Sequence, residues 1–400
     1  MPRRRKRQLS VMTMYNIFDY LEWRGDLSFG QAGICDADAV ILSRLSYLPF
    51  DGVVSEKFDN YITVSQAADR IFSGDAPAFL WEGDDRLLRA LAGSRRYSEL
   101  SLCGYVNEVD DERQMQFSAM LINLGDGIRF ISFRGTDNTL VGWQEDFNMF
   151  FTFPVASQIE AKRYFDAVVS AFDGELCLGG HSKGGNLAVY VSAFSAPEIQ
   201  DRILSIYSMD GPGFEMDHIK DSGFERIVDK IHTYVPQSSI FGMLFEHEES
   251  YTVIKSSQKG FLQHDVYSWE IKRDSLVELR RTNGTSAFFD HTLTQFIEKM
   301  TFDERRDFTE AIFNIMKSTE EYTFDDMADK LIKDIPIMLK TFTKLDSETR
   351  SMIGARLLSF LKTAGGNISD INPLTRENRR IRKEQKPKKY RKKNSKGTAV

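Results

Sequence analysis

The stretch that decides the fold is Glu175-Leu-Cys-Leu-Gly-Gly-His-Ser-Lys-Gly-Gly-Asn-Leu-Ala188, where a short apolar strand enters a glycine-rich turn and then a helix. Within it, Gly180-His-Ser-Lys-Gly184 has the form G-x-S-x-G. Such a turn needs small flanking residues, because the serine takes a strained backbone conformation and its neighbours approach closely. It also places the serine at a helix N-terminus, which favours an oxyanion. The pattern predicts Ser182 as a nucleophile; the structural alternative is a serine N-cap.

Strand and helix patterns alternate on both sides of this turn. An antiparallel strand pair is predicted around the turn Gly125-Asp-Gly, and the segments after it read in turn as helix, strand, helix, strand and strand. This alternation predicts the α/β class, with a mainly parallel sheet covered on both faces. The expected elements are the strands 114–124, 128–133, 175–180, 203–209 and 230–235, and the helices 157–173 and 184–195.

Changes in residue pattern and composition along the chain predict four regions. Residues 1–100 read as a mostly helical extension, with short helices at 36–47, 63–72 and 84–91. Residues 101–285 hold the α/β core. Residues 286–370 are predicted to be a second helical region, with amphipathic stretches at 288–300, 308–316, 327–342 and 349–361. Residues 371–400 are dense in Lys and Arg with little apolar content, which is typical of a disordered tail.

Charge is segregated along the chain. The net formal charge is −6, yet residues 3–7 are all basic and residues 376–396 contain twelve Lys or Arg and two Glu. The rest of the chain therefore carries −21, which argues against nucleic-acid binding by the folded surface. The basic ends either keep the protein soluble, contact nucleic acid by themselves, or make a peripheral contact with an anionic membrane.

The cysteines and the apolar runs indicate where the protein resides. The three cysteines, Cys35, Cys103 and Cys177, are far apart and show neither a CxxC motif nor the spacing of metal ligands. That usage is typical of a reduced compartment. The basic N-terminus is not followed by a long apolar segment, and no run approaches the ~20 residues of a membrane span. We therefore expect a cytoplasmic protein, at most peripherally bound to a membrane.

Two separate motifs resemble one enzyme family. Gly179-Gly-His-Ser-Lys-Gly-Gly-Asn-Leu-Ala188 is similar to the nucleophile elbow of the class 3 (fungal-type) lipases of the α/β-hydrolase superfamily. Phe133-Arg-Gly-Thr136, followed by Trp143 and Asp146, resembles the Phe-Arg-Gly-Thr/Ser and Trp-x-x-Asp motifs of the same lipases. The resemblance covers about residues 100–270. The whole chain, including Tyr20-Leu-Glu-Trp-Arg-Gly-Asp-Leu-Ser-Phe29, looks still more like an uncharacterised bacterial family of lipase-like proteins.

The resemblance implies an α/β-hydrolase fold and an oxyanion hole formed by Thr136 and the backbone N–H of Lys183. Acyl transfer needs two such donors aimed at the developing negative charge. Thr136 has a structural alternative, which is to cap the turn at Asp137. Lys183 departs from the lipase pattern, in which an apolar residue usually occupies this place.

The general base is expected downstream of the nucleophile. Gln263-His-Asp-Val-Tyr267 follows the last strand-like segment and resembles the lipase His-x-x-Tyr, so His264 is the candidate base, with a loop histidine as the alternative. His232 lies inside a strand pattern and is expected to be a packed core residue. His247 is surrounded by three glutamates and is expected in a solvated loop.

The position of the acid that orients the base is where the chain departs most from the class 3 lipases. Class 3 lipases place it before a Val-Pro-like turn, but this chain reads Val235-Pro-Gln-Ser-Ser-Ile240, with no carboxylate. The preceding strand ends in Asp210, at the edge of the sheet where such folds build sites, and another lipase branch takes its acid there. Asp210 is therefore the candidate acid, with a residue of an Asp-Gly-Pro turn as the alternative.

Together these residues predict a serine hydrolase that cleaves carboxylic esters, small or lipid-like, through an acyl-enzyme. The apolar segment 240–245 is expected either to line an acyl pocket or to form a lid, or simply to pack in the core. No metal or organic cofactor is implied. The missing carboxylate near Gln237 and the unusual Lys183 favour one alternative, a catalytically inactive hydrolase-like binding or scaffold protein.

Overall fold

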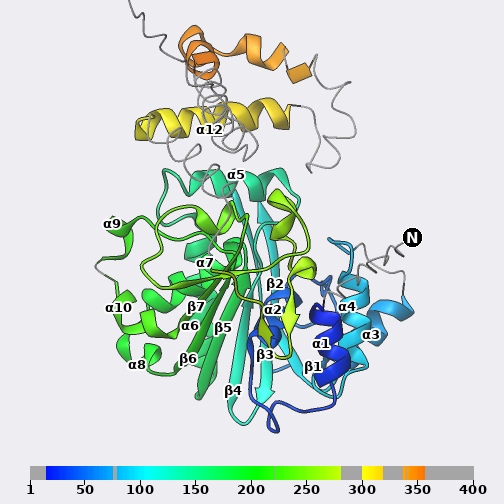
Figure 1. Ribbon diagram of the computed structural model, residues 1–400. Coiled ribbons are helices and arrows are strands. Elements are labelled where there is room, and N and C mark those ends of the chain that lie inside the picture. The colour runs from blue at the N-terminus through cyan, green and yellow to red at the C-terminus, as the bar shows by residue number, and fades with distance from the viewer. Residues whose placement is uncertain are drawn as a thin grey trace, which may run out of the picture.

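A central sheet of eight strands organises the protein (Figure 1). The computed structural model describes residues 15–74, 79–220, 222–280, 300–318, 337–338 and 340–355. The strands lie side by side in chain order; pairs from β1 to β4 are antiparallel and pairs from β4 to β8 are parallel. They are β1 Ile62–Thr63, β2 Ser101–Asp110, β3 Met115–Gly125, β4 Ile128–Phe133, β5 Glu175–His181, β6 Ile203–Met209, β7 Ile231–Pro236 and β8 Tyr251–Ile254.

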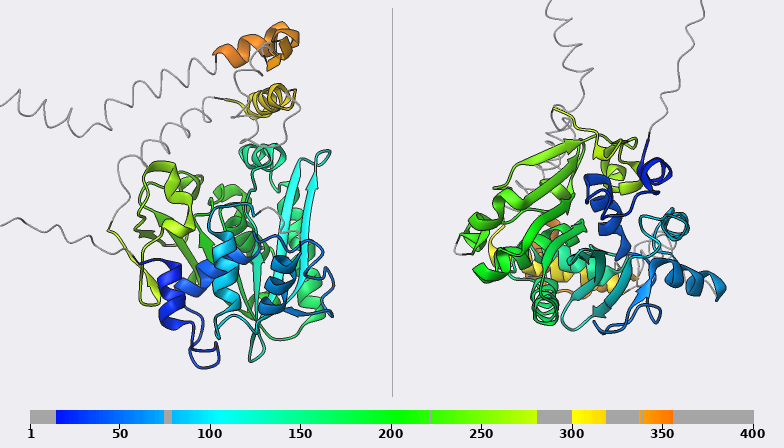
Figure 2. Two further views of the ribbon diagram at one scale, coloured as in Figure 1. Left: turned by 90° about the vertical axis from the view of Figure 1, so that its right-hand side faces the viewer. Right: turned by 90° about the horizontal axis from the view of Figure 1, so that it is seen from below.

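Helices cover both faces of the sheet, as the sequence predicted, and the α/β class is confirmed. Successive side chains of β5 point to opposite faces of the sheet. Leu176 and Leu178 lie in a core with α6 (Ala156–Ala171) and α7 (Lys183–Ala193), whereas Cys177 lies in the opposite core with α2 (Asp36–Leu45). The segment before β2 thus supplies one of the two layers, as the blue helices in Figure 2 show.

The remaining elements surround this framework. They are α1 Ile17–Arg24, α3 Val64–Ser73, α4 Asp84–Ala92, α5 Leu140–Asn148, α8 Pro197–Gln200, α9 Met216–Ile219, α10 Phe224–Ile227 and α12 Phe302–Lys317; the 3₁₀ turns Val228–Lys230, Phe241–Met243, Gly260–His264 and Val266–Ser268; and a small antiparallel pair, β9 Ile271–Lys272 and β10 Ser275–Leu276.

The antiparallel pair predicted around residues 125–127 is confirmed as β3 and β4. The turn residues Gly125, Asp126 and Gly127 all have positive φ angles, of 93°, 52° and 80°. Such angles favour glycine and tolerate aspartate. The local turn chemistry therefore accounts for the hairpin without help from the rest of the fold.

The C-terminal region is described in part. The amphipathic stretch 308–316 lies inside α12, which begins with a Thr301–Glu304 capping box. Helix α12 lies alongside α5, above the carboxyl ends of the parallel strands (Figure 1), and the rings of Phe147 and Phe313 are 5.6 Å apart. The stretches expected at 288–300, 327–342 and 349–361 lie partly or mostly outside the described residues, and so do both basic ends of the chain.

Candidate active site

Ser182 lies in the sharp turn between β5 and α7. Its φ of 58° is in the left-handed region, which is costly for a residue with a side chain. The flanking glycines explain why the turn can form. A Cβ at Gly180 would lie 2.3 Å from the carbonyl carbon of Gly184, and one at Gly184 would lie 2.1 Å from the carbonyl oxygen of Phe133. The predicted strand–turn–helix geometry around Ser182 is present.

Asp210 and His264 meet beside this turn. Nδ1 of His264 is 2.6 Å from Oδ2 of Asp210, whose side chain is 1% exposed. Asp210 follows β6, and its N–H donates to the carbonyl oxygen of Tyr234 on β7 at 2.8 Å. The carboxylate therefore stands at the edge of the sheet, although the sequence separates it from His264 by 54 residues.

The Val-Pro turn without a carboxylate still contributes to this pair. The Ser239 hydroxyl donates to Oδ1 of Asp210, and the Gly242 N–H in turn donates to the Ser239 hydroxyl at 3.0 Å. The two oxygens of Asp210 are thus bound on one side by Ser239 and on the other by His264. Nothing in the sequence singled out Ser239, because its role depends on contact with a residue 29 positions away.

The loop of His264 is fixed by main-chain contacts. The His264 carbonyl oxygen is 2.8 Å from Nε2 of His181, the residue before Ser182. The indole N–H of Trp269 donates to the Gln263 carbonyl oxygen at 2.8 Å, and the Ser238 N–H donates to the Gln263 side chain at 2.7 Å. These bonds hold the imidazole against the elbow, with the rings of His181 and His264 4.3 Å apart.

His181 is a neighbour of the site and not a base. Its side chain is buried, and burial holds its pKa well below the ordinary value, with the nearby His264 lowering it further. An imidazole that stays neutral donates one proton and accepts one. His181 uses both ring nitrogens to join the loop of His264 to Tyr47, whose hydroxyl is 3.2 Å from Nδ1.

Tyr47 is a site residue that sequence reasoning missed. Its hydroxyl accepts from the Gly135 N–H at 3.0 Å and lies 3.1 Å from the His181 carbonyl oxygen. It lies just after α2, in the layer that the N-terminal region contributes. No local motif marks it, because Gly135 is 88 residues further along the chain. Its ring is fully buried, with an Arg44 guanidinium 4.2 Å from the ring centre.

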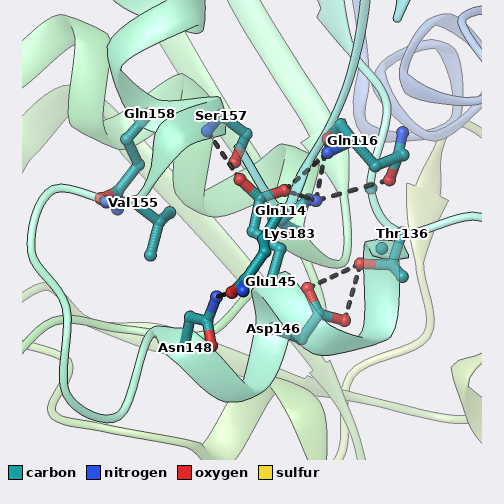
Figure 3. A network of polar contacts seen from close by, with 12 residues as sticks. Gln114, Gln116, Thr136, Glu145, Asp146, Asn148, Val155, Ser157, Gln158 and Lys183 are labelled. Carbon is teal, nitrogen blue, oxygen red and sulfur yellow. Dashed lines mark hydrogen bonds and ion pairs between the residues drawn. The ribbon is translucent and has the colours of Figure 1, made fainter. Parts of the chain in front are cut away.

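The segment after β4 lies directly against the elbow. A Cβ at Gly135 would be 2.8 Å from Cβ of Ser182, so only glycine permits this approach. The next residue, Thr136, directs its hydroxyl to both oxygens of Asp146 at 2.7 Å (Figure 3). Since the hydroxyl is bound in this way, the donor that Thr136 can offer an oxyanion is its main-chain N–H. The helix α5 is capped by Thr139 instead, whose hydroxyl accepts from the Gly142 N–H at 3.1 Å.

The main chain and the side chain of Lys183 contact different parts of the protein. The main chain begins α7, next to Ser182. The side chain is 1% exposed and leaves the elbow for the protein interior, where Nζ is 2.6 Å from Oε2 of Glu145 on α5. The unusual lysine therefore does not place a charge in front of Ser182.

Burial raises the pKa of Asp146 from 3.8 to about 6, with the positive charge of Lys183 acting in the opposite sense. Between pH 4 and 6 the folded protein thus keeps a proton that the unfolded chain has released. Stability then falls as the pH rises through this window. An asparagine side chain cannot ionise, so Asp146→Asn should not lose stability in this way. We expect the difference in melting temperature, variant minus wild type, to be about 2 °C or more larger at pH 7 than at pH 4. A difference that stays constant across this range, in thermal unfolding by circular dichroism, would contradict the prediction.

Aromatic side chains lie next to the base. The ring of Phe241 is 4.4 Å from that of His264, and the ring of Trp143 is 5.9 Å from that of Phe241. Above them, Trp143 packs with a small apolar cluster that joins α5 to α12 through Leu140, Phe313 and Met316. The apolar segment 240–245 therefore borders the site.

Two expectations about the other histidines are wrong. His232 is exposed on β7, where its ring stacks on Tyr207 at 5.1 Å, because it occupies the outward position of the strand. His247 is not in a solvated loop: its side chain is 5% exposed. Its ring nitrogens are each 2.8 Å from an acceptor, Oε1 of Glu249 and the carbonyl oxygen of Gly242. Glu249 is thus buried together with His247, and its acidic side chain does not indicate that His247 is exposed to solvent.

Within the part of the chain that the structure describes, no group of three or more His, Cys, Asp or Glu side chains could hold a metal ion. Among the same residues, no helix has both the length and the apolar character needed to cross a membrane.

One comparison with known proteins identifies a family. No curated protein matches the chain. The family model of the Mbeg1-like proteins matches residues 91–314, which is more than half of the chain and contains the elbow, Asp210, His264 and the segment after β4. The chain therefore belongs to the Mbeg1-like family, a lipase-like family.

Proposed function

We propose that this protein is a serine hydrolase that cleaves carboxylic esters through an acyl-enzyme. The observation that carries the proposal is the 2.6 Å contact between His264 and the buried Asp210, beside a serine in a strained strand-to-helix turn. A hydroxyl becomes a nucleophile when a base takes its proton, and the base works best when an acid orients it. Family membership supports a lipase-like hydrolase in general.

The proposed reaction follows from these positions. The Ser182 oxygen attacks the ester carbonyl carbon, and Nε2 of His264 takes the serine proton. Asp210 holds Nδ1–H and stabilises the imidazolium that forms. The main-chain N–H groups of Lys183 and Thr136 stabilise the oxyanion, and the Lys183 N–H also lies at the positive end of α7. His264 then protonates the leaving alcohol, and water releases the acyl group by the same steps.

We further propose that the acyl group is apolar. Phe241 and Trp143 stand next to His264, and the apolar cluster between α5 and α12 continues from them. Such side chains bind methylene groups by excluding water, at about 0.8 kcal/mol for each CH₂ that is buried.

Hydrolysis of p-nitrophenyl acetate, butyrate and octanoate tests the function and the acyl preference together. We expect kcat/KM to rise from acetate to octanoate, by up to about fourfold per buried CH₂. Phe241→Ala should flatten this rise, whereas Phe79→Ala, which removes a ring that stacks on Phe72 instead, should not. If the wild type turned over none of the three esters, the hydrolase proposal would fail and the non-catalytic alternative would be favoured.

A further inference from the structure

The residue that departs from the lipase pattern, Lys183, makes two close polar contacts inside the protein. Its Nζ donates to Oε2 of Glu145 at 2.6 Å and to the main-chain oxygen of Gln116 on β3 at 2.9 Å. Both members of the ion pair are 1% exposed. The first residue of α7 is thus attached by its own side chain to α5 and to β3.

Glu145 is bound from two further directions. Its Oε1 accepts from the Ser157 N–H in the first turn of α6 at 2.7 Å, and its Oε2 accepts from the Gln116 N–H at 3.1 Å. Figure 3 shows Lys183 and Glu145 between Gln116 on one side and Ser157 on the other. The carboxylate therefore has one position, fixed by the main chain of two elements besides its own.

The residue after Glu145 is bound to the other side of the site. Asp146 accepts the hydroxyl hydrogen bond of Thr136, and Thr136 and Lys183 are the two proposed oxyanion donors. Consecutive residues of α5 are thus attached to both donors, Glu145 to Lys183 and Asp146 to Thr136 (Figure 3).

We propose that the Lys183–Glu145 ion pair is a positioning element that sets the Lys183 N–H at the correct distance from Thr136. The proposal rests on the proposed hydrolase function. Replacing a buried ion pair by apolar side chains often leaves stability unchanged or increases it, so stability by itself does not explain this pair. An ammonium group has three directional donors, whereas an apolar side chain packs without a preferred direction. The pair therefore specifies a geometry that an apolar residue at position 183 leaves less defined.

The double variant Lys183→Met/Glu145→Gln separates positioning from stability. It removes both charges of the pair together, so neither partner stays buried without the other. We expect folding to be retained, KM for a p-nitrophenyl ester to change less than threefold, and kcat to fall about 10- to 100-fold, since a displacement of about 1 Å is enough for a loss of this size. Rates are expressed per site titrated with a fluorophosphonate, so that unfolded molecules do not lower kcat. A double variant with wild-type kcat would overturn the proposal.

A second variant covers the case in which the double variant does not fold. Glu145→Asp keeps both charges but shortens the acidic side chain by one methylene, which displaces Lys183. A lower kcat at unchanged KM supports the proposal, and an unchanged kcat overturns it.

The matched control removes an equally buried ion pair elsewhere. Arg96 and Asp38 are 2.6 Å apart, with side chains 1% and 0% exposed, in the N-terminal layer. Arg96→Met/Asp38→Asn should leave kcat per titrated site unchanged, whatever its effect on the melting temperature. If the wild type itself showed neither labelling nor turnover, the proposed function would fail, which is a different result from a wild-type kcat in the Lys183 variants.

Discussion

Ser182→Ala is expected to abolish labelling by a fluorophosphonate probe and to reduce hydrolysis of a short p-nitrophenyl ester by about 10³-fold or more. Without the hydroxyl no acyl-enzyme can form, and only substrate binding and the oxyanion donors remain to assist attack by water. The fold should be retained, because alanine is smaller than serine and β5 and α7 are held by main-chain contacts. The far-ultraviolet circular dichroism spectrum and the melting temperature report on this.

Ser192→Ala is the matched control for this variant. Ser192 lies in the same helix, α7, and its hydroxyl donates to the Ala188 carbonyl oxygen at 2.8 Å. It should keep both labelling and turnover. If Ser182→Ala retained most of the activity, Ser182 would not be the nucleophile.

Asp210→Asn is expected to lower kcat by about 10³- to 10⁴-fold while the protein stays folded. The carboxylate has two oxygens and meets two donors, Ser239 and His264. An asparagine offers one oxygen and one amide group in their place, and it carries no charge to stabilise the imidazolium. Steady-state kinetics against the same ester measure the loss, with KM expected to change little.

Two other aspartates show whether this loss is specific. Asp217→Asn changes a side chain that is 88% exposed, and Asp265→Asn changes the residue next to the base, whose side chain accepts from the Tyr267 N–H at 3.1 Å. Both variants should keep kcat within a few-fold of the wild type. A silent Asp210→Asn together with a damaging Asp265→Asn or Asp217→Asn would mean that another residue orients the base.

Local patterns were enough to predict the framework of the site. The hairpin of β3 and β4 follows from two strand-like runs around a turn whose residues accept positive φ angles. The turn at Ser182 follows from glycines at positions 180 and 184, because any larger residue there would collide with neighbouring backbone. These features depend on residues a few positions apart, and the sequence displays them directly.

The histidines show where local patterns mislead. His232 was expected in the core because it lies inside a strand pattern, yet side chains on alternate faces of a strand have different surroundings. His247 was expected in solvent because its neighbours are acidic, yet one of them, Glu249, is buried with it and also accepts from the Thr233 hydroxyl at 2.7 Å. In both cases the surroundings of the ring come from residues that the local sequence does not contain.

The sequence by itself determined the α/β class and the strained turn at Ser182, since each is marked by a pattern within a few residues, and its resemblance to lipase motifs supplied the candidate residues Asp210 and His264. Only the tertiary structure decided what surrounds them. It brought Tyr47 from the N-terminal layer to the elbow, gave Asp210 a second donor in Ser239, and turned the side chain of Lys183 away from Ser182 toward Glu145. Those partners are 29 to 134 positions apart in the chain, and hydrogen bonds between them exist only once the sheet has placed the ends of its strands side by side.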